Sequence, residues 1–278
     1  LLEALYISSY ASSFRTKSES DLIKNGEKEY SLRGFFREES EKTTSISVSY
    51  KNEKKRIEKN GKLVKDRKEL INAIPCVLFC HDDLEFSVGE PERRRFFIDQ
   101  CLSMYDVVYI DFVRKYKQIL KNRNILLKEE KYDLLEMYDI PLLKEGLEIQ
   151  KRRNKAIFKF NMIFTSLYKE ISGIDGVKIA YEPSWKSNDE TEILEYMLSK
   201  RDVDKVMKTT MTGPHRDKIY FVKDGKNFIP TASTGQRRLI SLILRIAQAT
   251  YYTEITDKKP ILLMDDVLLE LDPEKRRK

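Results

Sequence analysis

The feature that most constrains the fold of this chain is an unbroken apolar run, residues 261–264, which ends in Asp265 and Asp266. Such a run is typical of a strand buried on both faces, as in a parallel sheet. In open α/β sheets, ligands sit beyond the carboxyl ends of the strands, where these two carboxylates would emerge. The run therefore predicts an α/β fold with a ligand site at this end of the sheet.

Two adjacent carboxylates after an apolar strand are typical of a Walker B motif. Asp265 would hold Mg²⁺ through water, since Mg²⁺ keeps several waters and is shared with substrate phosphates. Asp266 would orient or deprotonate an attacking water. A strand that leads into an acidic turn would have the same sequence, so this alternative stays open for the segment taken alone.

A second candidate site lies upstream, where Ser233, Thr234 and Gly235 precede a helical apolar pattern. Backbone N–H groups and the helix dipole converge at a helix start, and Gly235 would let a phosphate approach the backbone. An ordinary Ser or Thr cap is the alternative for these residues. The segment lies about one helix and one loop before the predicted Walker B strand, which is the place of an ABC signature.

The rest of the sequence alternates between helix and strand patterns. Helices are predicted over residues 1–11, near 20–24, over 66–73, over most of 91–208 and after Gly235. Strands are predicted at 30–36, 45–50, 76–79, 177–181, 218–222 and 260–264, with a hairpin over 55–65. Asn60-Gly61 lies at the turn of that hairpin and is a strong turn signal. We expect residues 1–90 and 209–278 to form two parts of one lobe, and 91–208 a second, mainly helical lobe.

The charge balance is compatible with a polyanionic partner. Lys and Arg number 52 against 45 Asp and Glu, which gives a net charge of +7 and a pI near 9.0. Nucleic-acid binding would explain this excess, and solubility alone is the alternative explanation.

The three cysteines are too few for a disulfide framework and fit a reducing compartment, so we expect a cytoplasmic protein. Cys76, Cys80 and His81 lack the second pair of ligands that a structural zinc needs, and small buried side chains are the favoured interpretation. No apolar run approaches the roughly 18 residues of a membrane helix, so no membrane partner is expected.

These segments, together with several others in the same order, resemble the RecF family. The further matches are CHDDLEFSVGEPERRRFFID (80–99), LKNRNILL (120–127), GPHRD (213–217), LELD (269–272) and, near the start, LLEALY (1–6) with SFRT (13–16). LELD looks like the D-loop that follows Walker B, and LLEALY looks like the helix after the family's phosphate loop. The resemblance covers essentially the whole chain.

The resemblance implies an ABC-type ATPase head with a mainly helical second lobe, in which residues 1–90 and 209–278 form the ATPase lobe. It also implies ATP and Mg²⁺ as cofactors and an ATP-dependent homodimer. In that dimer Ser233, Gly235 and Gln236 of one subunit would meet the γ-phosphate bound by the other. Asp272 of the D-loop is a further residue implied to bind nucleotide.

The implied function is DNA replication, recombination and repair, including the SOS response. A protein of this kind binds duplex and gapped DNA, works with mediators of the RecO and RecR type, and helps to place the recombinase on single-stranded DNA. Arg216 and Arg93 are candidate contacts to DNA or nucleotide. For Arg216, beside His215, a structural turn is the alternative, and for Arg93 the alternative is pairing with nearby acidic side chains.

One motif of the family, the phosphate loop Gly-x-x-x-x-Gly-Lys-Ser/Thr, is absent from the sequence. Gly61 and Gly225 are each followed by lysine but lack the earlier glycine and the following hydroxyl. We expect the loop to lie before Leu1, and the switch histidine of ABC-type heads to lie beyond Lys278. ATP turnover is therefore left open, and a nucleic-acid-binding protein without turnover is the alternative. The charged helical lobe argues against a transporter subunit.

Overall fold

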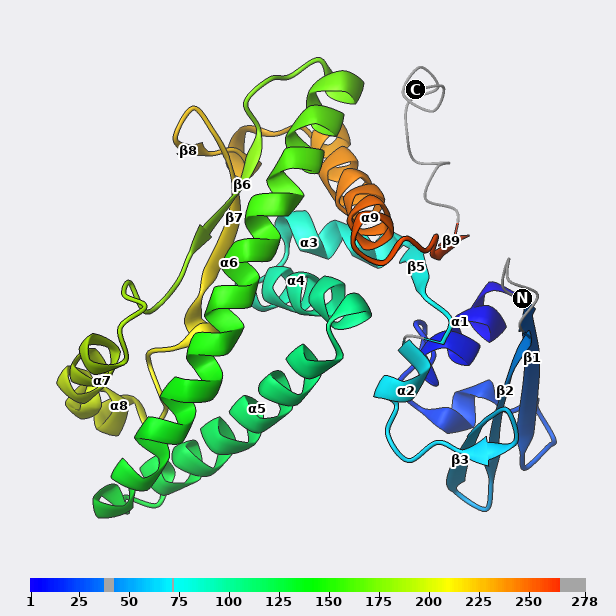
Figure 1. Ribbon diagram of the computed structural model, residues 1–278, viewed down its shortest axis with the longest axis horizontal. Helices are drawn as coiled ribbons and strands as arrows, with labels where there is room; N and C mark the ends of the chain where they lie inside the picture. Colours follow the sequence, from blue (N-terminus) through cyan, green and yellow to red (C-terminus); the bar gives the residue numbers. More distant parts are fainter. Residues whose placement is uncertain (38–42, 72, 266–278) are drawn as a thin grey trace. The chain divides into compact units, whose positions relative to one another are not determined.

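A computed structural model of the chain describes residues 1–37, 43–71 and 73–265 (Figure 1). The chain divides into two compact units. The first unit holds Leu1–His81 together with the described residues from Tyr252 onward, and the second holds Asp82–Tyr251. Two residues of the predicted site, Asp266 and Asp272, lie outside the described residues.

The first unit contains an antiparallel sheet in the order β1-β2-β3-β4. Its strands are β1 (Tyr30–Arg37), β2 (Thr43–Lys51), β3 (Lys54–Lys59) and β4 (Lys62–Leu63). Asn60 and Gly61 join β3 to β4 and have φ angles of 51° and 75°. Positive φ at both central residues is what a type I′ hairpin turn requires, so the predicted hairpin is confirmed.

The helix α1 (Leu2–Tyr10) packs against this sheet and against the short helix α2 (Lys68–Ile71). Side chains along β2 alternate between buried and more exposed positions, because successive residues of a strand point to opposite faces. The buried apolar core of this part consists of Ile7, Ala11, Ile46, Val48, Ile57, Leu70 and Ile74. A 3₁₀ turn at Glu19–Leu22 follows α1, close to the helix predicted near residues 20–24.

The first unit also contains a two-stranded parallel sheet formed by β5 (Cys76–Phe79) and β9 (Ile261–Met264). The two strands pair in register along their whole length, so they end at the same edge. This confirms the prediction that the apolar run before Asp265 is a strand of a parallel sheet.

The expectation that this strand is buried on both faces is wrong for the described structure. Leu263 is buried, whereas Ile261, Leu262 and Met264 expose 37%, 47% and 44% of their surface. The physical reason is that, within the described residues, β5 alone pairs with β9, while side chains of α1 pack around Leu263.

The second unit is mainly helical, as the periodicity predicts. Its helices are α3 (Glu85–Val88), α4 (Pro91–Tyr105), α5 (Val107–Lys128), α6 (Glu136–Ser172), α7 (Glu190–Ser199), α8 (Arg201–Met207) and most of α9 (Thr234–Thr256). The helix α6 is 37 residues long and packs alongside α5 (Figure 1). A Cβ atom on Gly146 of α6 would lie 2.6 Å from Cη2 of the buried Trp185, so only glycine lets α6 pack this closely on that ring.

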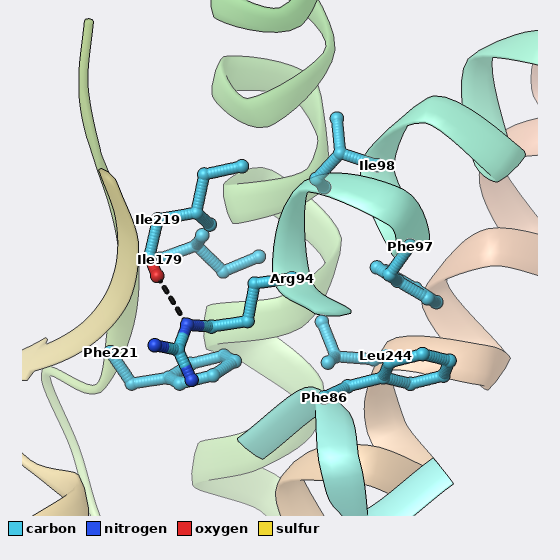
Figure 2. A pocket seen from close by; sticks show the side chains of 8 residues that line it. All are labelled: Phe86, Arg94, Phe97, Ile98, Ile179, Ile219, Phe221 and Leu244. Carbon is cyan, nitrogen blue, oxygen red and sulfur yellow. Dashed lines mark hydrogen bonds between the residues drawn. The ribbon is translucent and has the colours of Figure 1, made fainter. Parts of the chain in front are cut away.

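An antiparallel sheet in the order β6-β7-β8 lies in the same unit. Its strands are β6 (Lys178–Glu182), β7 (Lys218–Lys223) and β8 (Lys226–Asn227). Between α4, α9 and this sheet lies a small apolar cavity lined by Phe86, Arg94, Phe97, Ile98, Ile179, Ile219, Phe221 and Leu244 (Figure 2). Arg94 donates from Nε to the carbonyl oxygen of Ile219 at 2.6 Å, which ties α4 to β7.

A buried ion-pair network centred on Arg153 joins several elements of the second unit. The Arg153 guanidinium donates to both carboxylate oxygens of Asp99 at 2.8 and 2.9 Å, and to Asp217 at 2.9 Å. The hydroxyls of Tyr109 and Tyr181 donate to the same two carboxylates at 2.5 and 2.6 Å. The network thus links α4, α5, α6 and β6 to the residue that precedes β7.

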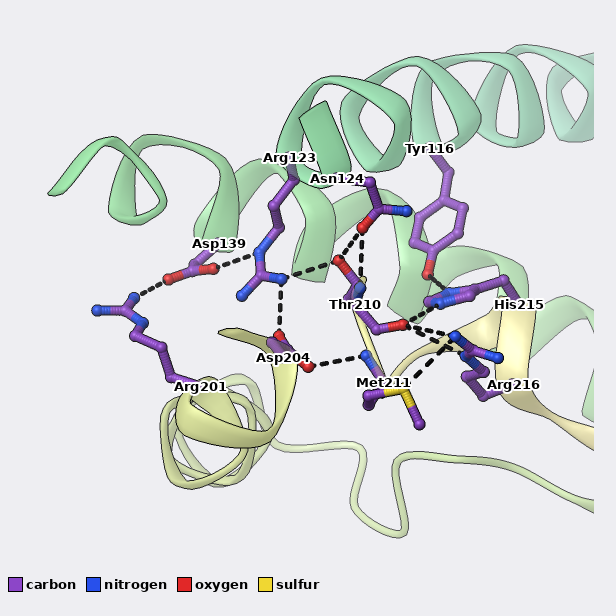
Figure 3. Close-up of polar contacts among 10 residues, drawn as sticks. All are labelled: Tyr116, Arg123, Asn124, Asp139, Arg201, Asp204, Thr210, Met211, His215 and Arg216. Atoms are coloured by element: carbon purple, nitrogen blue, oxygen red, sulfur yellow. Dashed lines mark hydrogen bonds and ion pairs between the residues drawn. The ribbon is translucent and has the colours of Figure 1, made fainter. Parts of the chain in front are cut away.

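A second network, centred on Arg123, joins α5, α6 and α8 (Figure 3). Arg123 donates to Asp139 at 3.0 Å, and through Nη1 to Asp204 at 2.7 Å and the Thr210 hydroxyl at 2.8 Å. Arg201 also pairs with Asp139. Arg123 and both aspartates are almost completely buried.

The two compact units do not have the same boundaries as the predicted lobes. The units divide after His81 and again within α9, after Tyr251. Compactness does not assign a function to either unit, so the division into ATPase and helical lobes at 1–90, 91–208 and 209–278 stays a prediction. Among the described residues, no helix is long and apolar enough to cross a membrane.

Candidate functional site

Asp265 lies directly after β9 at the carboxyl edge of the parallel sheet. Its backbone N–H donates to the carbonyl oxygen of Phe79 at 2.9 Å, which extends the pairing of β5 and β9 by one residue. Its carboxylate is partly exposed and points to Arg15, whose Nη2 lies 3.1 and 3.0 Å from the two carboxylate oxygens. The position is the one that the sequence predicts for a ligand-binding carboxylate.

The donor set around Asp265 fits a cation that is held mainly by other ligands. In the described part of the chain, no three His, Cys, Asp or Glu side chains gather closely enough to hold a metal ion. Mg²⁺ is commonly bound by one or two carboxylates together with water and substrate phosphates, and a single Asp265 carboxylate suits that mode. The role of Asp265 as a Mg²⁺ ligand stays a prediction, as does the role of Asp266 in the reaction.

The start of α9 carries the second predicted group, Ser233, Gly235 and Gln236. The Ser233 N–H donates to Oε1 of Gln236 at 2.7 Å, and the Gln236 N–H donates to Oγ of Ser233 at 3.2 Å. This reciprocal pair is a capping box, which satisfies two of the N–H groups that a helix start leaves unpaired. The capping alternative is therefore part of the structure.

The capping box still leaves hydrogen-bond donors for a ligand. Ser233 and Gln236 each use an acceptor oxygen in the box, so the Ser233 hydroxyl hydrogen and the Gln236 side-chain NH₂ remain to donate. The N–H groups of Thr234 and Gly235 have no carbonyl of the preceding turn to meet. Gly235 is exposed, and a Cβ there would have open space around it. Chemically, the arrangement is suited to an anion such as a phosphate.

The body of α9 holds its start in place. One face of the helix is buried in the core of the second unit through Leu239, Ile240, Ile243, Leu244 and Ala247. Arg245 on the same helix donates to the buried Asp83 at 2.7 and 3.1 Å. Asp265 belongs to the first unit and Ser233 to the second.

His215 is a structural residue in this fold. Its Nε2 lies 2.9 Å from the carbonyl oxygen of Thr210, and its Nδ1 lies 2.6 Å from the hydroxyl of Tyr116 (Figure 3). Burial lowers the pKa of His215 to about 4, and the nearby Arg216 adds to the effect. The imidazole is therefore neutral near pH 7, donates to Thr210 and accepts from Tyr116. This geometry favours the structural turn among the two interpretations of this segment.

The arginines proposed as anion contacts differ in what they do in the fold. Arg216 is exposed, and its guanidinium also donates to the Thr210 carbonyl at 3.2 and 3.3 Å. Arg94 and Arg95, which follow Arg93 on α4 and are not among the predicted contacts, donate to the backbone carbonyls of Ile219 and Asp217, respectively. Arg93 is exposed, and its guanidinium has no partner within the described residues. Arg93 and Arg216 stay predicted contacts to DNA or nucleotide.

Arg15 is a functional candidate that sequence reasoning missed, although the residue lies in the SFRT segment. Its contact with Asp265 spans 250 positions of the chain. No local sequence pattern predicts such a pairing. The signal that could have identified Arg15 is its position in a short polar turn after a helix that packs on the parallel sheet.

Comparison with known proteins identifies close relatives, although no family model matches the chain. The chain is 46% identical over 280 residues to the DNA replication and repair protein RecF of Treponema pallidum, covering 100% of this chain and 79% of the relative. It is 34% identical to the RecF protein of Leptospira interrogans, with 99% and 76% covered. The RecF protein of Moorella thermoacetica is likewise 34% identical, with 98% and 74% covered.

Solved structures give the same result at the level of the fold. The chain matches the recombination mediator protein RecF with ATP, of the RecFOR pathway, with a TM-score of 0.90 and 31% identity, over 99% of this chain and 77% of the other. An Smc head bound to the winged-helix domain of ScpA matches with a TM-score of 0.50 and 12% identity, over 99% and 79% of the two chains. The predicted α/β fold, an ABC-type ATPase head with a mainly helical second lobe, is confirmed.

Proposed function

Because this chain belongs to the RecF family of DNA replication and repair proteins, we propose that it is an ATP-dependent DNA-binding protein of recombinational repair. In this proposal the protein dimerises on ATP, binds duplex and gapped DNA, acts at DNA gaps and assists loading of the recombinase. Its partners are mediators of the RecO and RecR type, and it works in the cytoplasm.

The observation that carries the proposal is the start of α9. The Ser233 hydroxyl, the Gln236 amide group and the N–H groups at the helix start present several donors at an exposed position, with Gly235 leaving room for a ligand. A solved RecF structure at a TM-score of 0.90 contains ATP, whose γ-phosphate is the kind of ligand that such donors suit. In the proposed dimer, this helix start contacts the γ-phosphate held by the partner subunit.

Asp265 is the residue proposed to hold Mg²⁺ with the nucleotide. When bound, the cation would neutralise phosphate charge at the edge of the β5–β9 sheet. Asp265 is suited to this task because the backbone bond to Phe79 fixes its position while its carboxylate stays accessible. Asp266 is proposed to act on the attacking water, and Asp272 on the nucleotide.

Binding to DNA is supported by charge. The net charge of +7 favours association with a polyanion. Arg93 and Arg216 place guanidinium groups on the surface of the second unit. The solved RecF structures are of a recombination mediator in the RecFOR pathway. This relationship supports the proposal that the present chain also has RecO and RecR partners.

The proposal is tested with the full-length protein by fluorescence anisotropy of a labelled gapped duplex, with and without ATP and Mg²⁺. An Asp266→Asn background should slow hydrolysis and hold the ATP state. In that background we expect ATP to tighten DNA binding, and Ser233→Arg to abolish the ATP effect because the larger cation blocks the helix start.

The matched control is Ser166→Arg, the same substitution at an exposed serine of α6. It should keep the ATP effect, and circular dichroism should show both variants folded. DNA binding that ignores both ATP and Ser233→Arg would contradict the proposal and would favour a nucleic-acid-binding protein without ATP turnover.

A further inference from the structure

The contact between Arg15 and Asp265 closes the candidate cation site with a side chain of the same molecule. A single nitrogen, Nη2 of Arg15, lies 3.1 and 3.0 Å from the two oxygens of the Asp265 carboxylate. Both residues belong to the first compact unit, so the pairing lies within one body of the fold. The Arg15 guanidinium therefore binds the carboxylate that, in the proposed function, binds a divalent cation.

Local hydrogen bonds and ring contacts fix the turn that carries Arg15. The Ser13 hydroxyl oxygen accepts the N–H groups of Arg15 and Thr16 at 2.9 and 3.1 Å, and the same hydroxyl donates to Glu3 of α1. The Arg15 guanidinium lies 5.2 Å from the centre of the Phe14 ring, which adds a cation–π contact. The ring of Phe14 in turn packs edge-on against Tyr6 of α1, with 5.4 Å between their centres.

The ion pair between Arg15 and Asp265 is also weak enough to exchange. The Arg15 and Asp265 side chains expose 58% and 26% of their surface, so water can replace either partner. One nitrogen serves both oxygens, whereas the strongest arginine–carboxylate pairs use two parallel N–H bonds. Exposed ion pairs of this kind are weak, and a divalent ion with phosphate ligands is a stronger partner for a carboxylate.

From these observations we propose that Arg15 is a place-holding cation for Asp265. In the nucleotide-free head its guanidinium neutralises the carboxylate and keeps free cations from it. Arg15 releases Asp265 when nucleotide delivers a divalent cation, so that the site opens only to the metal–nucleotide complex. This inference rests on the function proposed above, because it takes Asp265 to be the metal-binding carboxylate.

The test measures cation affinity and does not depend on hydrolysis. Binding of Mn²⁺ to the full-length protein is followed by electron paramagnetic resonance of free Mn²⁺, in the presence of a non-hydrolysable ATP analogue. We expect Arg15→Ala to tighten Mn²⁺ binding by about two- to fivefold, the factor that a weak competing ion pair would impose. Arg15→Lys, which keeps the charge but places it as a single flexible ammonium, should lie between the two.

The matched control is Arg33→Ala. Arg33 is also exposed, lies in the same unit and has its guanidinium 5.2 Å from the Phe35 ring, but it makes no contact with Asp265. Arg33→Ala should bind Mn²⁺ like the wild type. In an Asp265→Asn background, Arg15→Ala should have no further effect, because the carboxylate for which Arg15 competes is gone.

The outcomes separate this inference from the proposed function. Suppose that the wild type binds Mn²⁺ and nucleotide, and that Arg15→Ala binds Mn²⁺ equally well or more weakly. This result would overturn the inference and leave the proposed function intact. If Asp265→Asn binds Mn²⁺ as tightly as the wild type, Asp265 is not the metal ligand and both are overturned.

Discussion

Arginine–aspartate pairs occur in both compact units, but their environments differ. In the second unit, Arg153 and Asp217 expose 5% and 0% of their side chains, and Tyr181 donates a further hydrogen bond to the aspartate. In the first unit, Arg15 and Asp265 expose 58% and 26%. The same two residue types thus form a sealed pair in one unit and an accessible pair in the other.

Burial decides what each pair can do. Burial raises the pKa of the Asp217 carboxyl, while Arg153 beside it acts in the opposite direction. Separating that pair would leave a charge in a medium of low polarity, so the pair is permanent and fixes the positions of the elements around it. The Arg15–Asp265 pair has water as an alternative partner for both groups, so it can exchange. Position in the fold therefore separates structural from exchangeable charge pairs.

Replacement of Arg153 is the substitution that should most affect stability, and it tests the difference between the buried and the exposed ion pair. Arg153→Met leaves the buried Asp217 and the partly buried Asp99 without their counter-charge, and we expect unfolding to become easier by about 3–5 kcal/mol. Urea unfolding followed by circular dichroism measures this loss. The neighbouring Arg152, which is partly exposed and pairs with Asp106 at 3.6 Å, is the control, and Arg152→Met should cost less than about 1 kcal/mol. Equal losses for both variants would remove the contrast.

A pH titration tests whether the interior of the second unit is sealed. The pKa of His215 is about 4 in the folded protein, against 6.5 for an ordinary histidine. Between these values the unfolded chain binds a proton that the folded chain does not, so stability is complete above pH 6.5 and falls as the pH falls toward 4. The loss should reach about 3 kcal/mol at pH 4, at roughly 1.4 kcal/mol for each pKa unit.

The measurement is the free energy of unfolding between pH 7 and pH 4 for the wild type, His215→Gln and His81→Gln. Glutamine can still accept from Tyr116 and donate to Thr210 but does not titrate, so His215→Gln should flatten this part of the profile. His81→Gln makes the same substitution at the other histidine of the chain, which is exposed, and serves as the control. A profile that does not change with His215→Gln would show that this site is open to water.

Two glycines extend the comparison from charge to packing. Gly146→Ala places a Cβ atom 2.6 Å from the buried Trp185 ring, and overpacking of this kind should cost about 1–3 kcal/mol. Gly235→Ala meets open space, and alanine favours a helix over glycine by roughly 0.5–1 kcal/mol, so stability should be unchanged or slightly higher. Thermal unfolding of the two variants checks the difference, and a destabilised Gly235→Ala would contradict the account of α9.

The smallest expected change is that for Arg15. Arg15→Ala should alter the free energy of unfolding by less than about 1 kcal/mol, since exposed ion pairs contribute little to stability. Urea unfolding beside Arg153→Met provides the direct comparison. If Arg15→Ala lowers the free energy of unfolding as much as Arg153→Met does, Arg15 is a structural residue and its pair with Asp265 does not exchange.

Much of the fold could be predicted because its signals are local. The apolar run before Asp265 predicted a strand of a parallel sheet, and Asn60-Gly61 predicted a hairpin, since each signal depends on neighbouring residues. The Ser233 segment predicted a helix start for the same reason. The resemblance in motif order then supplied the ABC-type head, which the solved structures confirm.

Other features depend on contacts between distant segments and could not be predicted. Arg123 and Arg153 lie in charged helices, where an arginine is usually solvated, and only the packing of the surrounding elements buries them. The pairing of Arg15 with Asp265 joins two ends of the chain. The exposure of Ile261 and Met264 likewise depends on which elements cover β9, and the composition of the strand does not contain that information.

The most direct test of the proposed function is sedimentation velocity of the full-length Asp266→Asn protein, with and without ATP and Mg²⁺. We expect a monomer without nucleotide and a dimer with it, because in the proposed function the start of α9 in one subunit contacts the γ-phosphate bound by the other. The same sedimentation coefficient under both conditions would contradict ATP-driven dimerisation.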